Sequence, residues 1–243
     1  MNAPHKSPAP GTLYLIPVPL GPTAPETVLP APVCDQARQL RHFIAENAKS
    51  ARAFLKSLNV PVPLQEIQIQ ELNEHTRSDE LPKLLETLQQ GIDVGLVSEA
   101  GCPGVADPGA DLVRLAQKEG IPVSPLIGPS SLLLALMGSG LCGQRFAFHG
   151  YLPAKDDERA KRLKALEQES RRLNQTQIFI ETPYRNTQML ASLTQHLSPT
   201  TLLCLASSLT LPQQRLRTRT VAQWRQEEEA AAKEPTVFLF LAI

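Results

Sequence analysis

Three loops rich in glycine, proline or serine are the places where this sequence could do chemistry: residues 19–22, 99–109 and 128–131. Loops of this kind leave backbone amide and carbonyl groups open to a ligand, because glycine carries no side chain, and they suit a small polar cofactor. The spacing matches neither Gly-x-Gly-x-x-Gly nor Gly-x-x-x-x-Gly-Lys, so the dinucleotide and P-loop fingerprints are absent. A tight surface turn explains any single loop equally well, but three loops on one rim favour a binding site.

The segments around these loops predict how they are positioned. Short apolar runs at 12–18, 93–98 and 121–126 each lead into one of the loops, and helical patterns follow at 110–119 and 132–137. Gly120 stands where the first helix should stop, and a serine of 128–131 can cap the second. Repeated strand, loop and helix order predicts a parallel sheet, whose ligands bind at the carboxyl ends of the strands. The three loops should therefore share one rim.

The second half of the chain predicts a further α/β domain. Strand patterns occupy 145–152, 177–181, 201–206 and 236–243, and helical patterns occupy 156–173 and 224–233. We place the boundary near residue 127, giving domains 11–127 and 128–243 after a disordered tail of residues 1–10 that holds three prolines. No fixed-period repeat is present, which excludes solenoids and propellers.

Composition restricts the partners. Lysine plus arginine and aspartate plus glutamate each total 24, so no global field draws the protein toward nucleic acid or an anionic membrane, and such binding must be local. The four cysteines lie far apart without a Cys-x-x-Cys pair, which predicts no zinc or dithiol site and a reduced compartment. Apolar runs shorter than the roughly 20 residues that span a bilayer, and a start without a leader pattern, predict a cytoplasmic protein.

Several segments together resemble the S-adenosylmethionine-dependent methyltransferases of the tetrapyrrole-methylase fold. Within that fold, they are similar to the branch that methylates a ribose 2′-hydroxyl of small-subunit (16S) ribosomal RNA. The resemblance is strongest at Val-Ser-Glu-Ala-Gly-Cys-Pro (97–103) and Ala-Asp-Pro-Gly (106–109). It runs from about residue 11 to residue 243 and includes the segments 11–15, 19–21, 128–131, 148–153 and 179–185.

The resemblance implies a two-lobed α/β fold, with a mostly parallel N-terminal sheet and a mixed C-terminal sheet with helices. It implies a homodimer that binds S-adenosylmethionine in a cleft and acts on ribosomal RNA or the small ribosomal subunit. Methyl transfer from a sulfonium is an in-line displacement with a built-in leaving group, so the enzyme mainly positions the reactants. The implied cofactor-binding residues are Pro19, Ser98, Glu99, Ala100, Gly101, Val105, Ala106, Asp107, Ser130, Ser131, Thr182, Ala206 and Pro235.

Three residues are the candidates for positioning the nucleophile: Glu46, Glu181 and Arg185. The sequence departs from the branch at 46–49, where Glu-Asn-Ala-Lys stands for Glu-Asp-Thr-Arg, and at 207–211, where Ser-Ser-Leu-Thr-Leu stands for Arg-Glu-Leu-Thr-Lys. Phosphate contacts supply much of the affinity for RNA, so these losses weaken or redirect substrate binding. Two alternatives stay open: a non-catalytic, dimeric cofactor-binding relative, and a methyltransferase of a small, tetrapyrrole-like substrate.

Other polar residues have plain structural interpretations beside functional ones. Glu99 could bind a ligand or cap a turn, and Glu181 with Arg185 could form an ordinary ion pair at a helix start. For Cys102 a packed thiol is favoured over a nucleophile, and for His149 a satisfied buried histidine over a general base. The alternating Arg215, Arg217 and Arg219 form a basic ridge or a charged edge strand, and a solvated face explains the charged helix at 155–172.

Overall fold

Alternating apolar strands and amphipathic helices divide this chain into two units, Met1–Pro129 and Ser130–Ile243. The structure is a computed structural model and describes residues 9–227 and 233–243. The division lies two residues beyond the expected boundary at 127. Residues 1–8 of the expected tail lie outside the described residues.

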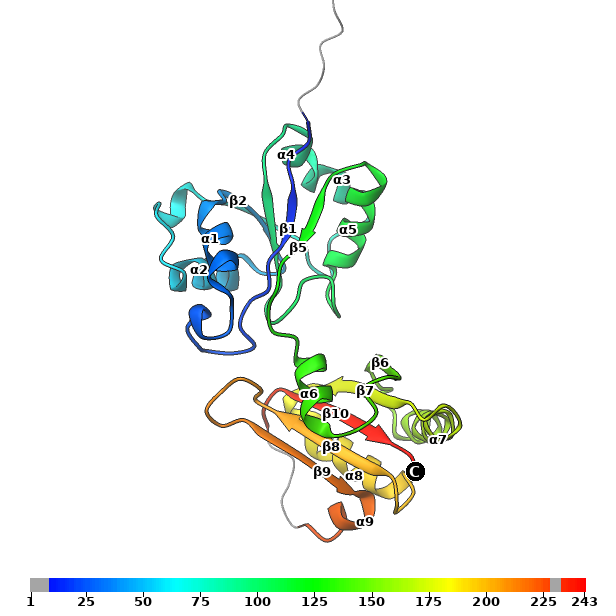
Figure 1. Cartoon of the computed structure of the whole chain (residues 1–243). Helices are drawn as coiled ribbons and strands as arrows, with labels where there is room; N and C mark the ends of the chain where they lie inside the picture. Colours follow the sequence, from blue (N-terminus) through cyan, green and yellow to red (C-terminus); the bar gives the residue numbers. More distant parts are fainter. Residues whose placement is uncertain (1–8, 228–232) are drawn as a thin grey trace, which may run out of the picture. The chain divides into compact units, whose positions relative to one another are not determined.

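Unit 1 is built on a five-stranded sheet in the order β3-β2-β4-β1-β5, in which every pair is parallel (Figure 1). This confirms the parallel N-terminal sheet. The strands are β1 (Leu13–Leu15), β2 (His42–Ala45), β3 (Gln68–Glu71), β4 (Val94–Val97) and β5 (Val123–Pro125). The helices are η1 (Pro25–Thr27), α1 (Ala31–Gln39), α2 (Ala48–Ser57), η2 (Leu64–Glu66), α3 (Leu81–Leu84), α4 (Glu86–Gln89) and α5 (Gly109–Lys118).

Alternation along β2 shows how the two faces of this sheet are buried. Phe43 packs into the core beneath α1 and α2, whereas its neighbour Ile44 packs into the core beneath α3, α4 and α5. All four residues of β4 are buried, as expected for a central parallel strand covered on both faces. Gly95 of β4 has no room for a side chain, because a Cβ there would lie 2.8 Å from side-chain atoms of Ile16 and Phe43.

Unit 2 contains a mixed five-stranded sheet in the order β6-β7-β10-β8-β9. The pair β6 and β7 is parallel and the other pairs are antiparallel, which confirms the mixed C-terminal sheet. The strands are β6 (Phe146–Tyr151), β7 (Thr176–Glu181), β8 (Leu202–Ser207), β9 (Arg215–Thr220) and β10 (Thr236–Leu241). The helices are α6 (Ser131–Ser139), α7 (Asp156–Leu173), η3 (Pro183–Arg185), α8 (Asn186–His196) and α9 (Val221–Trp224).

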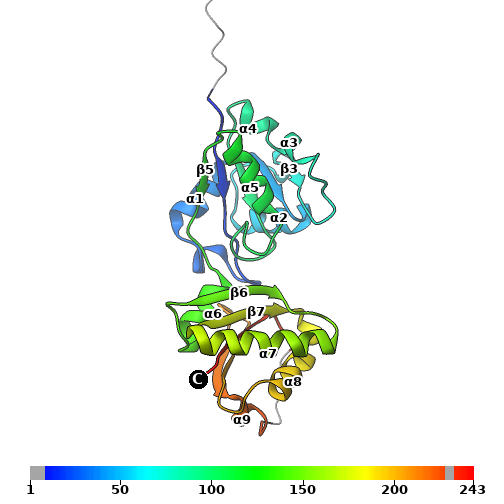
Figure 2. The same cartoon turned by 90° about the vertical axis from the view of Figure 1, so that its right-hand side faces the viewer.

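The core of unit 2 lies between this sheet and the helices α7 and α8 (Figure 2). Phe179 of β7 and Phe238 of β10 stack at its centre, with ring centroids 5.5 Å apart. Helix α6 contacts β8, β9 and β10. Among the described residues, no helix has the length and apolar character needed to cross a bilayer.

Two sequence-based expectations need correction. The helix expected at 224–233 is wrong, because α9 ends at Trp224, where the expected helix began, and residues 225–227 are not helical. A capping box between Thr220 and Gln223 starts α9 earlier in the chain, and residues 228–232 lie outside the described part. Ser130 occupies the N-cap position of α6, but its side chain makes no capping hydrogen bond.

Candidate functional site

A cavity of about 250 Å³ lies in unit 1 at the carboxyl ends of β1 and β4. Pro19 and Gly21 line it from the loop after β1, Ser98 and Glu99 from the loop after β4, and the hydroxyl residues Ser50 and Ser57 from α2. The structure thus brings three expected residues, Pro19, Ser98 and Glu99, to the same cavity. The serines of α2 were missed by the sequence analysis, although Asn47, which caps α2 with its side chain, marks where that helix starts.

The loops after β1 and β4 are joined by backbone hydrogen bonds. The amide of Val18 donates to the carbonyl of Gly101 at 2.9 Å, and the amide of Gly101 donates back to Val18 at 3.1 Å. Gly101, Gly104 and Ala106 all have positive φ, at 74°, 78° and 59°. These left-handed residues turn the loop sharply, and alanine adopts that conformation only at a cost that the surroundings must offset.

Asp107 holds the loop in this shape. Its Oδ1 accepts hydrogen bonds from the amides of Gly104 and Gly109, both at 2.8 Å. Burial raises the pKa of the Asp107 carboxyl, and the two amides oppose that rise. The Asp107 carboxylate is therefore engaged inside the loop, so its contribution to a ligand site is to shape the backbone around it.

The loop after β4 also contacts the loop after β5, at residues 128 and 129. The thiol of Cys102 donates to the carbonyl of Pro129 at 3.4 Å, and burial raises its pKa, as expected for a packed thiol and not for a reactive thiolate. Gly128 packs against Pro17, where a Cβ would lie 2.2 Å from the proline Cβ. The segments after β1, β4 and β5 thus meet within unit 1.

Several donors on this rim are open. Within the part of the chain that the structure describes, the amides of Ala100 and Ala106 donate to no protein group, and both residues are exposed. Val105, between Gly104 and Ala106, is 49% exposed. Open amides, hydroxyls and an exposed apolar side chain are the features that hold a small polar ligand with an apolar part.

Glu46 follows β2 and lies beside the loop after β4. The backbone of Glu99 lies close enough to the Glu46 carboxyl to lower its pKa, against the larger influences that raise it. The pKa of Glu46 is raised, first by burial and then by the negative charges of Glu99 and Asp107. A carboxylate with a raised pKa is a stronger base than an exposed one, which is the property of a group that takes a proton from a hydroxyl.

In unit 2, three strand ends meet because of the sheet register. Glu181 of β7 pairs with Thr236 of β10, which pairs with Ser207 of β8. The hydroxyls of Ser207 and Thr236 lie 2.8 Å apart, and the Asn186 amide donates to Thr236 Oγ1 at 3.1 Å.

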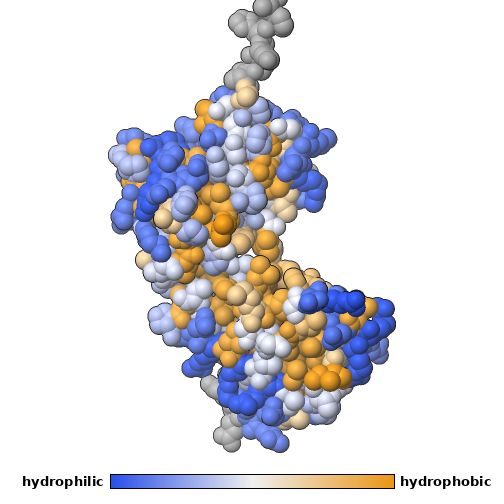
Figure 3. Space-filling model, viewed as in Figure 1, coloured by the Kyte–Doolittle hydropathy of each residue, from blue (hydrophilic) through white to orange (hydrophobic). Residues whose placement is uncertain are grey.

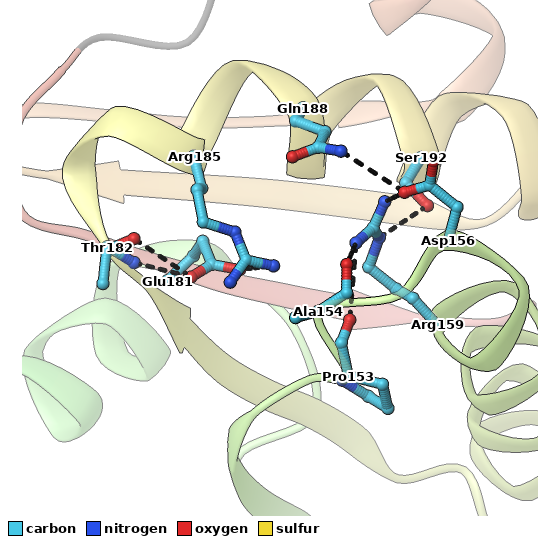
Figure 4. Close-up of polar contacts among 9 residues, drawn as sticks. All are labelled: Pro153, Ala154, Asp156, Arg159, Glu181, Thr182, Arg185, Gln188 and Ser192. Carbon is cyan, nitrogen blue, oxygen red and sulfur yellow. Dashed lines mark hydrogen bonds and ion pairs between the residues drawn. The ribbon is translucent and has the colours of Figure 1, made fainter.

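Glu181 and Arg185 face each other at this edge (Figure 4). Arg185 Nη2 lies 3.2 Å from Oε2 of Glu181, whose side chain is 1% exposed. The other oxygen, Oε1, accepts the backbone amide of Thr182 at 2.8 Å. The expected ion pair is therefore present at the start of η3, and Arg185 is the partly exposed member of the pair.

The remaining expected cofactor residues of unit 2 differ in accessibility. Ala206 is 1% exposed inside β8, and the carbonyl of Pro235 accepts the amide of Ser208 at 3.0 Å. Ser208 and Thr210, in the segment where charged residues are replaced, have positive φ of 50° and 69°. A β-branched threonine is strained in that region, and such strain concentrates at functional turns.

Arg159 is a buried cation that the sequence analysis did not single out. It is 2% exposed and donates to the carbonyls of Pro153 and Ala154, to Ser192 Oγ and to Asp156 (Figure 4). These contacts fasten the segment before α7 to α8. Its arrangement is that of a structural clamp.

His149 and the arginines of β9 make the contacts expected of structural residues: a histidine with hydrogen-bond partners and a charged edge strand. His149 Nε2 lies 2.6 Å from Gln177 Oε1, and its Nδ1 lies 3.3 Å from Arg162, so both ring nitrogens have partners. Arg217 and Arg219 both pair with Glu227 at 3.0 Å, and Arg217 also lies over the Trp224 ring. Two arginines of the ridge, Arg217 and Arg219, thus share the carboxylate of Glu227.

Relatives of this chain carry a common name. It is 35% identical over 183 residues to Ribosomal RNA small subunit methyltransferase I of Pseudomonas aeruginosa, a match covering 75% of this chain and 61% of the relative. It is 33% identical over 232 residues to the protein of the same name from Escherichia coli O157:H7, covering 94% of this chain and 77% of that relative. The chain matches no protein-family model.

Solved structures share the fold at low sequence identity. The methyltransferase CobJ aligns over 96% of this chain and 100% of its own, with a TM-score of 0.63 and 18% identity. The cobalt precorrin-4 methyltransferase CbiF aligns over 95% of this chain and 94% of its own, with a TM-score of 0.58 and 12% identity. These likenesses confirm the tetrapyrrole-methylase-like fold, and the sequence matches show that the chain belongs to the family of Ribosomal RNA small subunit methyltransferase I.

Proposed function

We propose that this protein transfers a methyl group from S-adenosylmethionine to a ribose 2′-hydroxyl of small-subunit ribosomal RNA. The observation that carries the proposal is Glu46, a half-buried carboxylate with a raised pKa beside the loop of residues 98–107. Membership of the family supports the substrate class, and the shared fold supports methyl transfer.

The residues on the rim of unit 1 fit the cofactor. S-adenosylmethionine carries a carboxylate, an ammonium group, ribose hydroxyls and an adenine ring, and it supplies an electrophilic methyl group on sulfur. The amides of Ala100 and Ala106 are open donors, and the exposed Glu99 can accept from ribose or ammonium. Ser130, the first residue of unit 2, has an Oγ that makes no capping bond. The proposed cofactor-binding set is Pro19, Ser98, Glu99, Ala100, Gly101, Val105, Ala106, Asp107, Ser130, Ser131, Thr182, Ala206 and Pro235.

In the proposed mechanism, Glu46 accepts the proton of the ribose hydroxyl as the oxygen becomes the nucleophile. Its raised pKa makes it a better base, and it must be ionised before the reaction, so the rate should rise with pH through that raised value. Arg185 and Glu181 would position the substrate through a partly exposed guanidinium whose orientation the buried carboxylate fixes. Alignment of the reacting groups supplies the rest of the rate enhancement.

The segment 207–211 is compatible with both alternatives to an RNA methyltransferase. Ser208 Oγ donates to the Glu234 carboxylate, and no basic side chain stands in this segment, so it offers no cation to a phosphate. A non-catalytic relative that binds S-adenosylmethionine, or a methyltransferase of a small tetrapyrrole-like substrate, would share that feature.

We also propose a homodimer in the cytoplasm. Helix α6 carries exposed Leu133 and Met137, which are 52% and 78% exposed and one turn apart. Phe146 on β6 is also 44% exposed. Figure 3 shows hydrophobic side chains gathered on the face of unit 2 turned to the viewer. A second copy of this chain would remove that surface from water, as homodimer interfaces do.

The deciding experiment is incubation of the protein with labelled S-adenosylmethionine and small ribosomal subunits from cells that lack it. We expect label in a ribose 2′-O-methyl group of the RNA, and its loss with Glu46→Gln. No incorporation into RNA, together with labelling of a tetrapyrrole, would support the small-substrate alternative. No labelling of either substrate, with cofactor binding retained, would support the non-catalytic one.

Cofactor binding is tested separately by thermal melting. Saturation at about 100 times the dissociation constant should stabilise the protein by about 2.7 kcal/mol. Ser130→Tyr should abolish this shift, whereas the matched control Ser78→Tyr, on an exposed loop, should retain it. A melting temperature unchanged by the cofactor would contradict the proposed site.

A further inference from the structure

In helix α7 most of the acidic residues lie apart from the basic ones, although a count along the sequence shows nearly balanced charge. From Lys155 to Arg172 the chain holds seven basic and five acidic residues, which reads as a balanced, solvated face. Three of the five acids, Asp156, Asp157 and Glu158, lie in the first turn of α7. There they complement the positive end of the helix dipole.

The acids of α7 are largely used within unit 2. Asp156 accepts from Arg159 and Gln188, and Glu158 pairs with Lys155 at 3.2 Å. Glu167 is 8% exposed and accepts from Ser198 and Thr201. These three carboxylates therefore do not neutralise the middle of the helix. The other two acids are the exposed Asp157, four residues before Lys161, and the half-buried Glu169, three residues before Arg172, and they offset part of the positive charge at these two positions.

The basic residues that follow share the outer face. The period of 3.6 residues places Lys161, Lys164, Gln168 and Arg172 on one side of α7, opposite Leu163 and Leu166, which are fully buried. Among the ion pairs of the described residues, 9–227 and 233–243, none involves Lys161, Lys164 or Arg172. Lys161 and Lys164 lie in the middle of the helix, so the helix dipole does not explain them.

We infer that the outer face of α7, defined by Lys161, Lys164, Gln168 and Arg172, is a docking surface for the phosphate backbone of the RNA substrate. Figure 2 shows α7 along its length at the surface of unit 2, and Figure 3 shows hydrophilic side chains where α7 lies. From Lys161 to Arg172 the helix rises about 16 Å, which spans several phosphates of a strand. This inference rests on the proposed function.

The composition of the face favours RNA over an anionic membrane. A helix that lies on a bilayer inserts large apolar side chains between its basic residues. On α7 the exposed positions among the cations are Ala165 and Gln168, and the described part of this helix has no large exposed hydrophobic residue. The face offers charge and an amide without an apolar anchor.

The docking surface on α7 would also supply positive charge that the segment 207–211 lacks in comparison with the family motif. The segment 207–211 carries no cation, and the chain has zero net charge, so attraction to RNA must come from a local cluster. Helix α7 supplies such a cluster from unit 2.

The test compares Lys161→Gln/Lys164→Gln with Arg114→Gln/Lys118→Gln on α5, which removes the same charge from another exposed helix. Affinity for small ribosomal subunits is measured across a salt series, with thermal melting as a check on folding and on S-adenosylmethionine binding. We expect the α7 variant to bind at least about tenfold more weakly at 0.1 M salt, with a salt slope shallower by about 1.4–1.8. Lys161→Arg/Lys164→Arg should restore both values.

Other outcomes would contradict the inference. If wild-type protein methylates the subunits and the α7 variant binds them with unchanged affinity and slope, the docking surface is wrong and the proposed function stands. If wild-type protein neither binds nor methylates the subunits, both fall. Binding of anionic phosphatidylserine vesicles, lost in the α7 variant while RNA binding is unchanged, would assign the face to a membrane.

Discussion

Glu99, in the loop after β4, lies close enough to Glu46, at the end of β2, to change the pKa of the Glu46 carboxyl in two ways. The negative side chain of Glu99 raises this pKa, and the Glu99 backbone lowers it. The side chain and the backbone of one residue therefore act on the Glu46 pKa in opposite directions. Burial is the larger influence and keeps the pKa above its ordinary value.

Glu46→Gln should leave stability unchanged or higher at neutral pH. A carboxyl whose pKa is raised on folding stabilises the fold below its unfolded-state pKa, and that contribution is lost as pH rises through the folded value. Above that window the ionised Glu46 destabilises the native state, and glutamine removes the penalty. Urea unfolding at several pH values measures this.

The matched control is Glu86→Gln on α4, where the side chain is exposed. It should have nearly the same stability as wild type at neutral pH. If Glu46→Gln were less stable than wild type at pH 8, the assignment of burial as the dominant influence would be wrong.

Asp107→Ala should loosen the loop that it shapes. The substitution leaves the amides of Gly104 and Gly109 without their acceptor, at a cost of about 1–3 kcal/mol. S-adenosylmethionine affinity should fall in parallel, measured by calorimetry. Asp107→Asn keeps an acceptor oxygen and should recover most of the loss, and equal defects in both variants would point to the charge instead.

Gly128→Ala tests the contact between the segments after β5 and β1. The new methyl group would overlap Pro17, with its Cβ 2.2 Å from the proline Cβ, so the backbone must move. We expect a loss of about 1–3 kcal/mol in thermal unfolding, as for other overpacked sites. Gly143→Ala has no atom within 4 Å of its Cβ and should be nearly neutral. Similar melting temperatures for the two variants would refute this packing argument.

Arg185→Gln should destabilise unit 2, because it leaves the buried Glu181 carboxylate without a cation. Arg185 is 28% exposed, so solvent screens part of the effect and we expect about 1–3 kcal/mol. Glu181→Gln/Arg185→Gln should be more stable than Arg185→Gln alone. If the double variant were the less stable of the two, the ion pair would not be the reason for the loss.

Sequence patterns predicted those elements whose signals are local. Helix α7 matches its expected bounds because three acids start it and Asn174, with φ of 48°, stops it in the left-handed conformation. Strands β2 and β3 were not among the predicted strands, since the first has four residues and the second reads Gln-Ile-Gln-Glu at the sheet edge. Their pairing depends on neighbours distant in sequence, which periodicity does not record.

The sequence predicted those parts of the site whose backbone conformation follows from the residue type. Glycines 101 and 104 indicate positive φ, but nothing in the sequence shows that Ala106 shares it or that Asp107 holds the turn. The packed Cys102 and the satisfied His149 followed their structural interpretations. A count of charged residues could not show the basic face of α7, because only the folded structure decides which carboxylates are buried or paired.

Strand β10 occupies the middle of the sheet in unit 2, between β7 and β8, although it is the last strand of the described residues to be synthesised. A ribosome-bound chain can complete unit 1 once residue 129 has emerged, whereas β7 and β8 have no partner between them until residues 236–241 leave the exit tunnel. Until then the edges of two apolar strands stay unpaired, which exposes the nascent unit 2 to aggregation during translation.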